Sequence, residues 1–291
     1  MMRLTATAEG PLRIDAVVRG LPVYLDHCAM VELAKGNSDR RARFLRVLDA
    51  GADLLFSVGN GWEMAGPLGG TADALRDFLD GVGPNWFPVE LDPHAVVERE
   101  LKGGGGPKAC LSERFAKDLV RMATRNQGRI VVCDSAVFNL GAVFDWMQPQ
   151  RDELEQAKVE FDDALVKRIE GYRLQHEQDA SWLDNAFPDF GFFNPRMPCT
   201  FTYMHLVRTL VREAKAYRLK KGDAADFCHA VVGSSFARAV VLDKHWKRRV
   251  DGLPKPHNLA KFYSVSQLDA FVTDLEAAVV RLQGRNAQGA A

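Results

Sequence analysis

The chain has 291 residues, enough for one large domain or two modest ones. Its composition, 47% hydrophobic and 26% charged, is typical of a globular protein, and the lack of a run of about 18 apolar residues predicts no membrane span. Lys+Arg and Asp+Glu both number 38, and this zero net charge argues against a protein that holds nucleic acid by bulk charge alone.

The five cysteines are scattered along the chain and form no CxxC pair. This pattern indicates neither a disulfide framework nor a thiolate zinc site. The first residues contain no apolar core of the usual signal-peptide length, so we predict a cytoplasmic protein.

Strand-like and helix-like segments alternate in the first hundred residues. Apolar runs at 22–26, 53–58 and 85–91 predict strands, and the helical spacing of apolar residues predicts helices at 38–51 and 71–83. A β-α-β-α-β order of this kind implies a parallel sheet covered by helices.

A glycine-rich stretch at 102–107 breaks this alternation, and helical patterns dominate from there to residue 204. The alternation then resumes with a helix predicted over 204–220 and strands predicted at 239–243 and 261–265. We therefore predict a core formed by residues 1–101 and 205–291, interrupted by a mainly helical insertion at 102–204.

Four acidic residues occupy equivalent places in these units. Asp26 and Asp243 each end a predicted strand, Glu63 lies just past another, and Asp226 opens a predicted helix. Right-handed crossovers in a parallel sheet bring such positions to one edge, where the carboxyl ends of the strands lie. Crowded carboxylates repel each other unless a cation is present, and oxygen ligands suit Mg²⁺ or Mn²⁺. The chemistry best supported by this pattern is hydrolysis of a phosphodiester.

The segments VYLDHCAMVELAKG, LLFSVGNGWEMAG and DFCHAVVGSSFARAVVLDKHW, in that order, resemble a PIN-like nuclease domain over about 20–101 and 205–285. The resemblance implies a three-layer α/β/α fold with a central, mostly parallel sheet. It also implies Mg²⁺- or Mn²⁺-dependent cleavage of RNA, with Asp26, Glu63, Asp226 and Asp243 matching the family's acidic positions.

Each acid also has a structural alternative. The alternative for Asp26 is a helix cap, for Asp243 a solvated strand end, and for Glu63 an ordinary surface acid. Asp223 and Asp226 are alternatives, because either could cap the helix while the other binds the ion. We predict that Asp223 caps the helix and that Asp226 is the ligand.

Other candidates depend on the fold around them. Asp134 would join the site only if the apolar run before it is a strand of the main sheet. Ser57 either donates a hydrogen bond to one of the acids or simply ends its strand. His27 and His229 lie next to predicted acids, but without HxH or HxxxH spacing we interpret them as packed histidines.

Basic residues cluster beside the acids at 39–46, 215–221 and 243–249. They are either solvated helix faces or a surface for the phosphate backbone, with Trp246 or Tyr217 stacking on a base. The candidate phosphate contacts are Arg40, Lys221, Lys244, Lys247 and Arg248.

The sequence thus predicts a metal-dependent endoribonuclease acting on single-stranded or structured RNA. One alternative is a catalytically silent scaffold that binds RNA or a protein, and another is a DNA-directed nuclease. The insertion at 102–204 is the predicted surface for a protein partner or a second copy of the chain.

Overall fold

A computed structural model describes residues 2–6, 12–105, 107–125, 136–137, 139–220 and 222–289 of the chain. Its centre is a five-stranded sheet in which every neighbouring pair of strands is parallel. In spatial order the strands are β5 (Trp86–Val89), β4 (Ala52–Ser57), β3 (Leu21–Leu25), β7 (Ala239–Leu242) and β8 (Lys261–Ser264). The predicted parallel sheet is therefore confirmed.

The inner strands are continuous apolar runs because both faces of the sheet are covered. All residues of β4, β5 and β7 are buried, whereas in the edge strand β8 only Tyr263 is buried. Neighbouring residues of β3 contribute to opposite faces: Val23 packs in one hydrophobic cluster and Tyr24 in the other.

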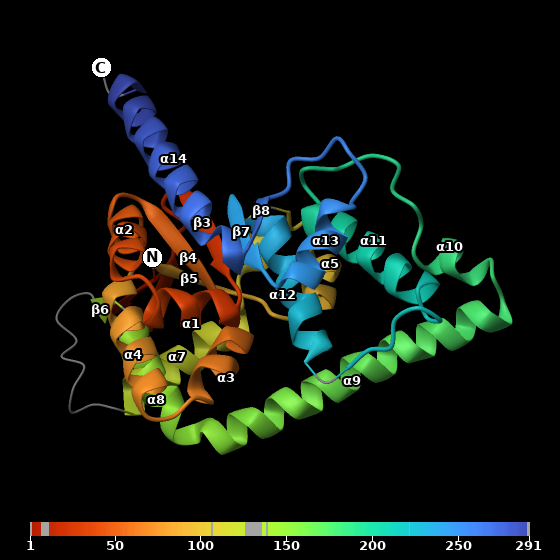
Figure 1. Cartoon of the computed structure of the whole chain (residues 1–291), viewed down its shortest axis with the longest axis horizontal. Coiled ribbons are helices and arrows are strands. Elements are labelled where there is room, and N and C mark those ends of the chain that lie inside the picture. The colour runs from red at the N-terminus through yellow and green to blue at the C-terminus, as the bar shows by residue number, and fades with distance from the viewer. Residues whose placement is uncertain are drawn as a thin grey trace.

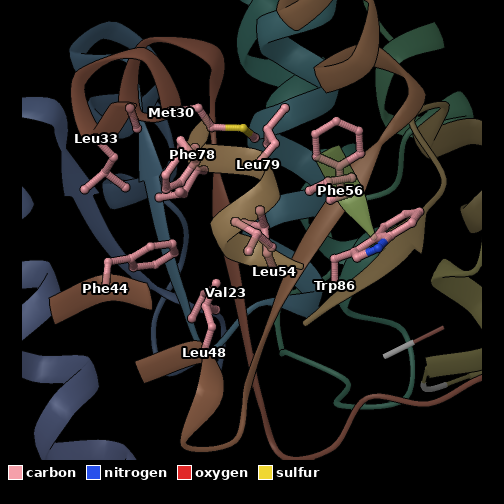
Figure 2. Packing of buried hydrophobic residues seen from close by; sticks show 14 of the residues in the cluster. Val23, Met30, Leu33, Phe44, Leu48, Leu54, Phe56, Phe78, Leu79 and Trp86 are labelled. Carbon is pink, nitrogen blue, oxygen red and sulfur yellow. The ribbon is translucent and has the colours of Figure 1, made fainter. Parts of the chain in front are cut away.

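Helices cover both faces and make three layers (Figure 1). Helices that contribute to the first hydrophobic cluster (Figure 2) are α1 (His27–Lys35), α2 (Ser38–Asp49), α3 (Val58–Ala65), α4 (Gly70–Val82), α7 (Glu113–Arg125), α8 (Leu140–Met147) and α14 (Leu268–Gly289). Helices that contribute to the second are α5 (Pro93–Leu101), α6 (Pro107–Cys110), α9 (Arg151–Gln178), α10 (Trp182–Ala186), α11 (Pro198–Arg212), α12 (Asp223–Phe236) and α13 (Lys244–Asp251). Helix α3 (Val58–Ala65) follows β4 directly.

The segment predicted as an insertion is mainly helical where the structure describes it, and it shares the core. Phe115 of α7 and Phe144 of α8 belong to the first cluster, and Phe201 of α11 belongs to the second. The helix predicted over 204–220 begins earlier and ends earlier, as α11, so it crosses the predicted boundary at residue 205.

Three short strands were not predicted. Strands β1 (Met2–Ala6), β2 (Leu12–Ala16) and β6 (Ala136–Val137) form a small antiparallel sheet in the order β2-β1-β6.

Helix α9, with 28 residues, extends along one side of the molecule and passes α3 and α12 (Figure 1). Across all the ranges described, we find no helix with the length and apolar character needed to span a membrane.

Candidate functional site

Asp26 and Asp243 follow the ends of the adjacent parallel strands β3 and β7. Each side chain caps the helix that begins next: Asp26 accepts a hydrogen bond from Ala29 N at 2.9 Å, and Asp243 accepts one from His245 N at 2.7 Å. The capping alternative predicted for Asp26 is thus present, and Asp243, for which the predicted alternative was a solvated strand end, is exposed and also caps a helix. The capping bond involves only Oδ1 in each case.

Glu63 and Asp226 reach the same edge from two helices. Glu63 lies on α3, which starts where β4 ends, and Asp226 lies in the first turn of α12, which leads back to β7. Because a crossover helix runs against the direction of its strands, the start of α12 lies at the carboxyl edge of the sheet. The structure therefore brings the four predicted acids to one edge.

The four acids are close enough for their charges to act on one another. Burial raises the pKa of Asp226 to about 7, and the negative charges of the other three acids act in the same direction, whereas His229 opposes them. Burial likewise raises the pKa of Asp26, which is 5% exposed, to about 6. Two of the four acids are thus held in surroundings that disfavour their charged forms.

Glu63 behaves differently because cationic groups surround it. Its Oε1 lies 3.4 Å from Lys158 Nζ, and its Oε2 lies 3.4 Å from His229 Nε2. Burial alone would raise the pKa of Glu63, but His229, Lys158 and His27 outweigh it and lower this pKa to about 2. Glu63 is therefore the one acid of the group whose charge is already matched.

His229 is part of a buried chain of polar contacts. It is 1% exposed, its Nδ1 meets the hydroxyl of Tyr24, and that hydroxyl lies 3.4 Å from Ser57 Oγ. Within the described residues, neither His229 Nε2 nor Glu63 Oε2 has a well-oriented hydrogen bond. Burial lowers the pKa of His229, but the neighbouring carboxylates, Glu63 first, raise it overall.

The sequence analysis named His229 but interpreted it as a packed histidine, and it missed Lys158 altogether. The position of His229, three residues after Asp226 on one helix, signalled that the two side chains share a face. Lys158 had no such signal, because it comes from α9, far from the acids in the sequence.

The prediction that Asp223 caps α12 is wrong. Asp223 is the first residue of α12, and its carboxylate accepts a hydrogen bond from Lys220 N. The cap comes instead from Asp162 on α9, which accepts hydrogen bonds from Gly222 N at 2.7 Å and Ala224 N at 3.1 Å. The φ of Gly222, 94°, lies in the left-handed region that glycine adopts readily, and it lets the chain turn at this point.

Ser57 is the N-cap of α3. Its Oγ accepts a hydrogen bond from Asn60 N, and Asn60 Oδ1 accepts one from Ser57 N, which makes a capping box. In the part of the chain that the structure describes, no carboxylate accepts a hydrogen bond from Ser57. Of its two predicted roles, Ser57 therefore has the one at the end of its strand, where it caps the next helix. Asp134 and Lys221 lie outside the described residues.

The predicted phosphate contacts separate into two kinds. Arg40 holds Asp269 through two bonds of 2.8 and 2.9 Å and also meets Glu32, and Lys247 pairs with Asp251. Both cations already form ion pairs with carboxylates of the chain, which argues against the prediction that they contact phosphates. The remaining pair, Lys244 and Arg248, is exposed one turn apart on α13, without a side-chain hydrogen bond or ion pair to any described residue.

Base stacking by Trp246 is excluded because this side chain is 1% exposed within the second hydrophobic cluster. Tyr217 is half-buried, stacks on His245 at 4.8 Å between ring centroids, and carries the guanidinium of Arg249 over its ring at 4.6 Å. Tyr217 is therefore already covered by two partners.

The donor chemistry of the site fits a hard divalent ion. Its oxygens are carboxylate oxygens, and the raised pKa values of Asp26 and Asp226 reflect buried negative charge without a matching cation. Among the residues described, however, no three His, Cys, Asp or Glu side chains are arranged as ligands around one point. Glu63 in particular is directed at Lys158 and His229.

Comparison of the chain with models of protein families, with curated proteins and with solved structures found no match. Its function is therefore argued from the site itself.

One consequence of the raised pKa is a pH-dependent gain of stability in Asp226→Asn. Below about pH 4 the carboxyl is neutral in both the folded and the unfolded chain, so its contribution to folding is intact. As the pH rises from about 4 to the folded pKa of about 7, the unfolded chain ionises before the folded one, and the wild type loses stability until both forms are ionised. We expect equal stability near pH 4 and an advantage for the variant of about 2 kcal/mol at pH 8, reduced from the full shift because the group is half-buried. Urea denaturation with a chelator present measures this, and an advantage independent of pH would contradict it.

Proposed function

We propose that this chain is a metal-dependent endonuclease with a PIN-like fold, which hydrolyses phosphodiester bonds in single-stranded or structured RNA in the cytoplasm. The observation that carries the proposal is the meeting of Asp26, Glu63, Asp226 and Asp243, from four different elements, at the carboxyl edge of a parallel sheet. This edge is where open α/β sheets bind ligands. When bound among these acids, Mg²⁺ or Mn²⁺ supplies positive charge to the phosphate and acidity to an attacking water.

The chain's own groups are arranged for this chemistry. Asp26 and Asp243 are held by their capping bonds, so an ion would meet oxygens whose positions are already restricted. Lys244 follows Asp243 directly, and Arg248 lies one turn further on α13; both are exposed and suited to bind the phosphates of an RNA strand. The preference for RNA over DNA rests on the family resemblance of the sequence.

A second candidate is a PIN-like scaffold that binds RNA or a protein without cleaving. The observation that favours it is the pairing of Glu63 with Lys158 and His229, which already matches one of the four charges. A DNA-directed nuclease is the third reading, and the additional acid that would support it, Asp134, lies outside the described residues.

Cleavage of a circular single-stranded RNA tests the proposal, because only an endonuclease can open a circle. We expect cleavage with Mn²⁺, complete loss when EDTA removes the ion, and recovery when Mn²⁺ is added in excess. Retention of the RNA on a filter without any cleavage in Mn²⁺ would instead support the scaffold. Faster opening of a circular single-stranded DNA would support the DNA-directed nuclease.

A further inference from the structure

Helix α9 is fixed against both helices that carry acids of the site. Phe161 packs edge-on against Trp62, the residue before Glu63, with 5.6 Å between ring centroids. Asp162 binds the first amides of α12, the helix that carries Asp226. Lys158, one turn before Asp162 on α9, is thereby held beside Glu63.

The four acids divide into two groups by their partners. Both oxygens of Glu63 face cationic or polar groups of the chain, Lys158 Nζ and His229 Nε2, at 3.4 Å each. The other three acids, Asp26, Asp226 and Asp243, form no ion pair within 4.0 Å with any residue that the structure describes. A divalent ion placed against Glu63 would be repelled by the ammonium of Lys158, which forms no ion pair with any of the other three acids.

We propose that Glu63 is not a ligand of the divalent ion but holds Lys158 in place as a second cation of the site, which contacts a phosphate of the RNA. On this assignment the carboxylate oxygens for the ion come from Asp26, Asp226 and Asp243, which share the edge of the sheet but are not arranged around one point in this structure. This inference rests on the proposed function and assigns separate roles to its acids.

Two properties of Lys158 suit a phosphate contact. An ammonium group has three N–H donors, and the ion pair of Lys158 with Glu63 joins its Nζ to a single oxygen at 3.4 Å, so N–H donors remain for phosphate oxygens. The side chain of Lys158 is 24% exposed, against 11% for Glu63, so Lys158 is the more accessible member of the pair.

The role of Glu63 is tested by calorimetry with Mn²⁺ alone. We expect Glu63→Gln to weaken Mn²⁺ binding by no more than about tenfold, and Asp226→Asn to weaken it by about 100-fold or more. Equal losses in the two variants would make Glu63 a ligand and overturn this inference. A wild type that neither binds Mn²⁺ nor cleaves RNA would overturn the proposed function together with it.

The role of Lys158 is tested by steady-state kinetics on single-stranded RNA. Lys158→Met is expected to raise KM about tenfold and to reduce the slope of log affinity against log salt by about 0.7, the value for one lost phosphate contact. Its Mn²⁺ affinity should hold or rise, because a repelling charge is gone. Lys158→Arg should restore most of the RNA affinity, since it keeps a cationic donor.

Lys167→Met is the matched control, because Lys167 is an exposed lysine of the same helix away from the site. It should leave KM and the salt slope at their wild-type values. A Lys158→Met variant with the salt slope of this control would show that Lys158 only ties α9 to the core, and would overturn the inference. Should Lys158→Met fail to fold, the comparison of Glu63→Gln with Asp226→Asn still decides whether Glu63 is a ligand of the ion, and a ligand role for Glu63 overturns the inference.

Discussion

The substitution Asp226→Asn is expected to lower kcat/KM for Mn²⁺-dependent RNA cleavage by about 10³-fold or more. Asparagine keeps the shape of the side chain but removes a negative charge from the first turn of α12, so the ion is lost or displaced. Positioning and charge stabilisation each contribute a few kcal/mol to such reactions, and about 1.4 kcal/mol corresponds to a tenfold change in rate.

Asp223→Asn is the comparison variant for this experiment. Its carboxylate lies one turn earlier and is directed at Lys220 N, so we expect a loss of less than about threefold. The pair of variants decides which of the two aspartates serves the site. Equal weak activity in the wild type and in Asp226→Asn would point to a contaminating nuclease and would favour the scaffold.

The second large effect is expected from Asp162→Ala, although Asp162 is not one of the acids of the site. Asp162 is 3% exposed, and its loss leaves the amides of Gly222 and Ala224 without their partner at the start of α12. We expect a loss of about 2–4 kcal/mol in the free energy of unfolding, the sum of a lost cap and two lost hydrogen bonds. Because Asp226 lies in this first turn, Mn²⁺ affinity should fall by about 10- to 100-fold, as for other residues that orient a ligand.

Asp163→Ala provides the control, since Asp163 is the next residue of α9 and is exposed. Urea denaturation and Mn²⁺ calorimetry on both variants measure the two effects. If Asp162→Ala matched Asp163→Ala in Mn²⁺ affinity while losing stability, the cap would serve only the fold, and α12 would hold Asp226 in place without it.

The strands of the main sheet could be predicted because their cause is local. Continuous apolar runs such as 53–58 are required wherever a parallel strand is covered on both faces, and the structure has β4 there. Strands β1 and β2 were missed because short runs that mix apolar and charged residues, as in MRLTA and LRIDA, resemble ordinary surface segments until they pair.

The end of α11, by contrast, could not be predicted because its cause is a residue distant in the sequence. Its apolar pattern continues past Arg212, so the sequence predicted a helix to residue 220. In the structure Arg173 of α9, which is 5% exposed, donates hydrogen bonds to the carbonyl oxygens of Leu210 and Tyr217. A distant side chain thus satisfies the Leu210 carbonyl in the last turn of the helix and holds the segment beyond it through the Tyr217 carbonyl, and periodicity carries no information about such a partner.

The site likewise has features with a local cause and features with a cause distant in the sequence. The sequence by itself determined that Asp26, Glu63, Asp226 and Asp243 meet at one edge, because strand ends and right-handed crossovers follow from the local order of apolar and helical segments. Only the tertiary structure decided that Asp162 caps α12 and that Lys158 pairs with Glu63. The period of a helix determines which of its residues share a face, but what that face meets depends on how α9 packs against α3 and α12, elements separated from it along the chain.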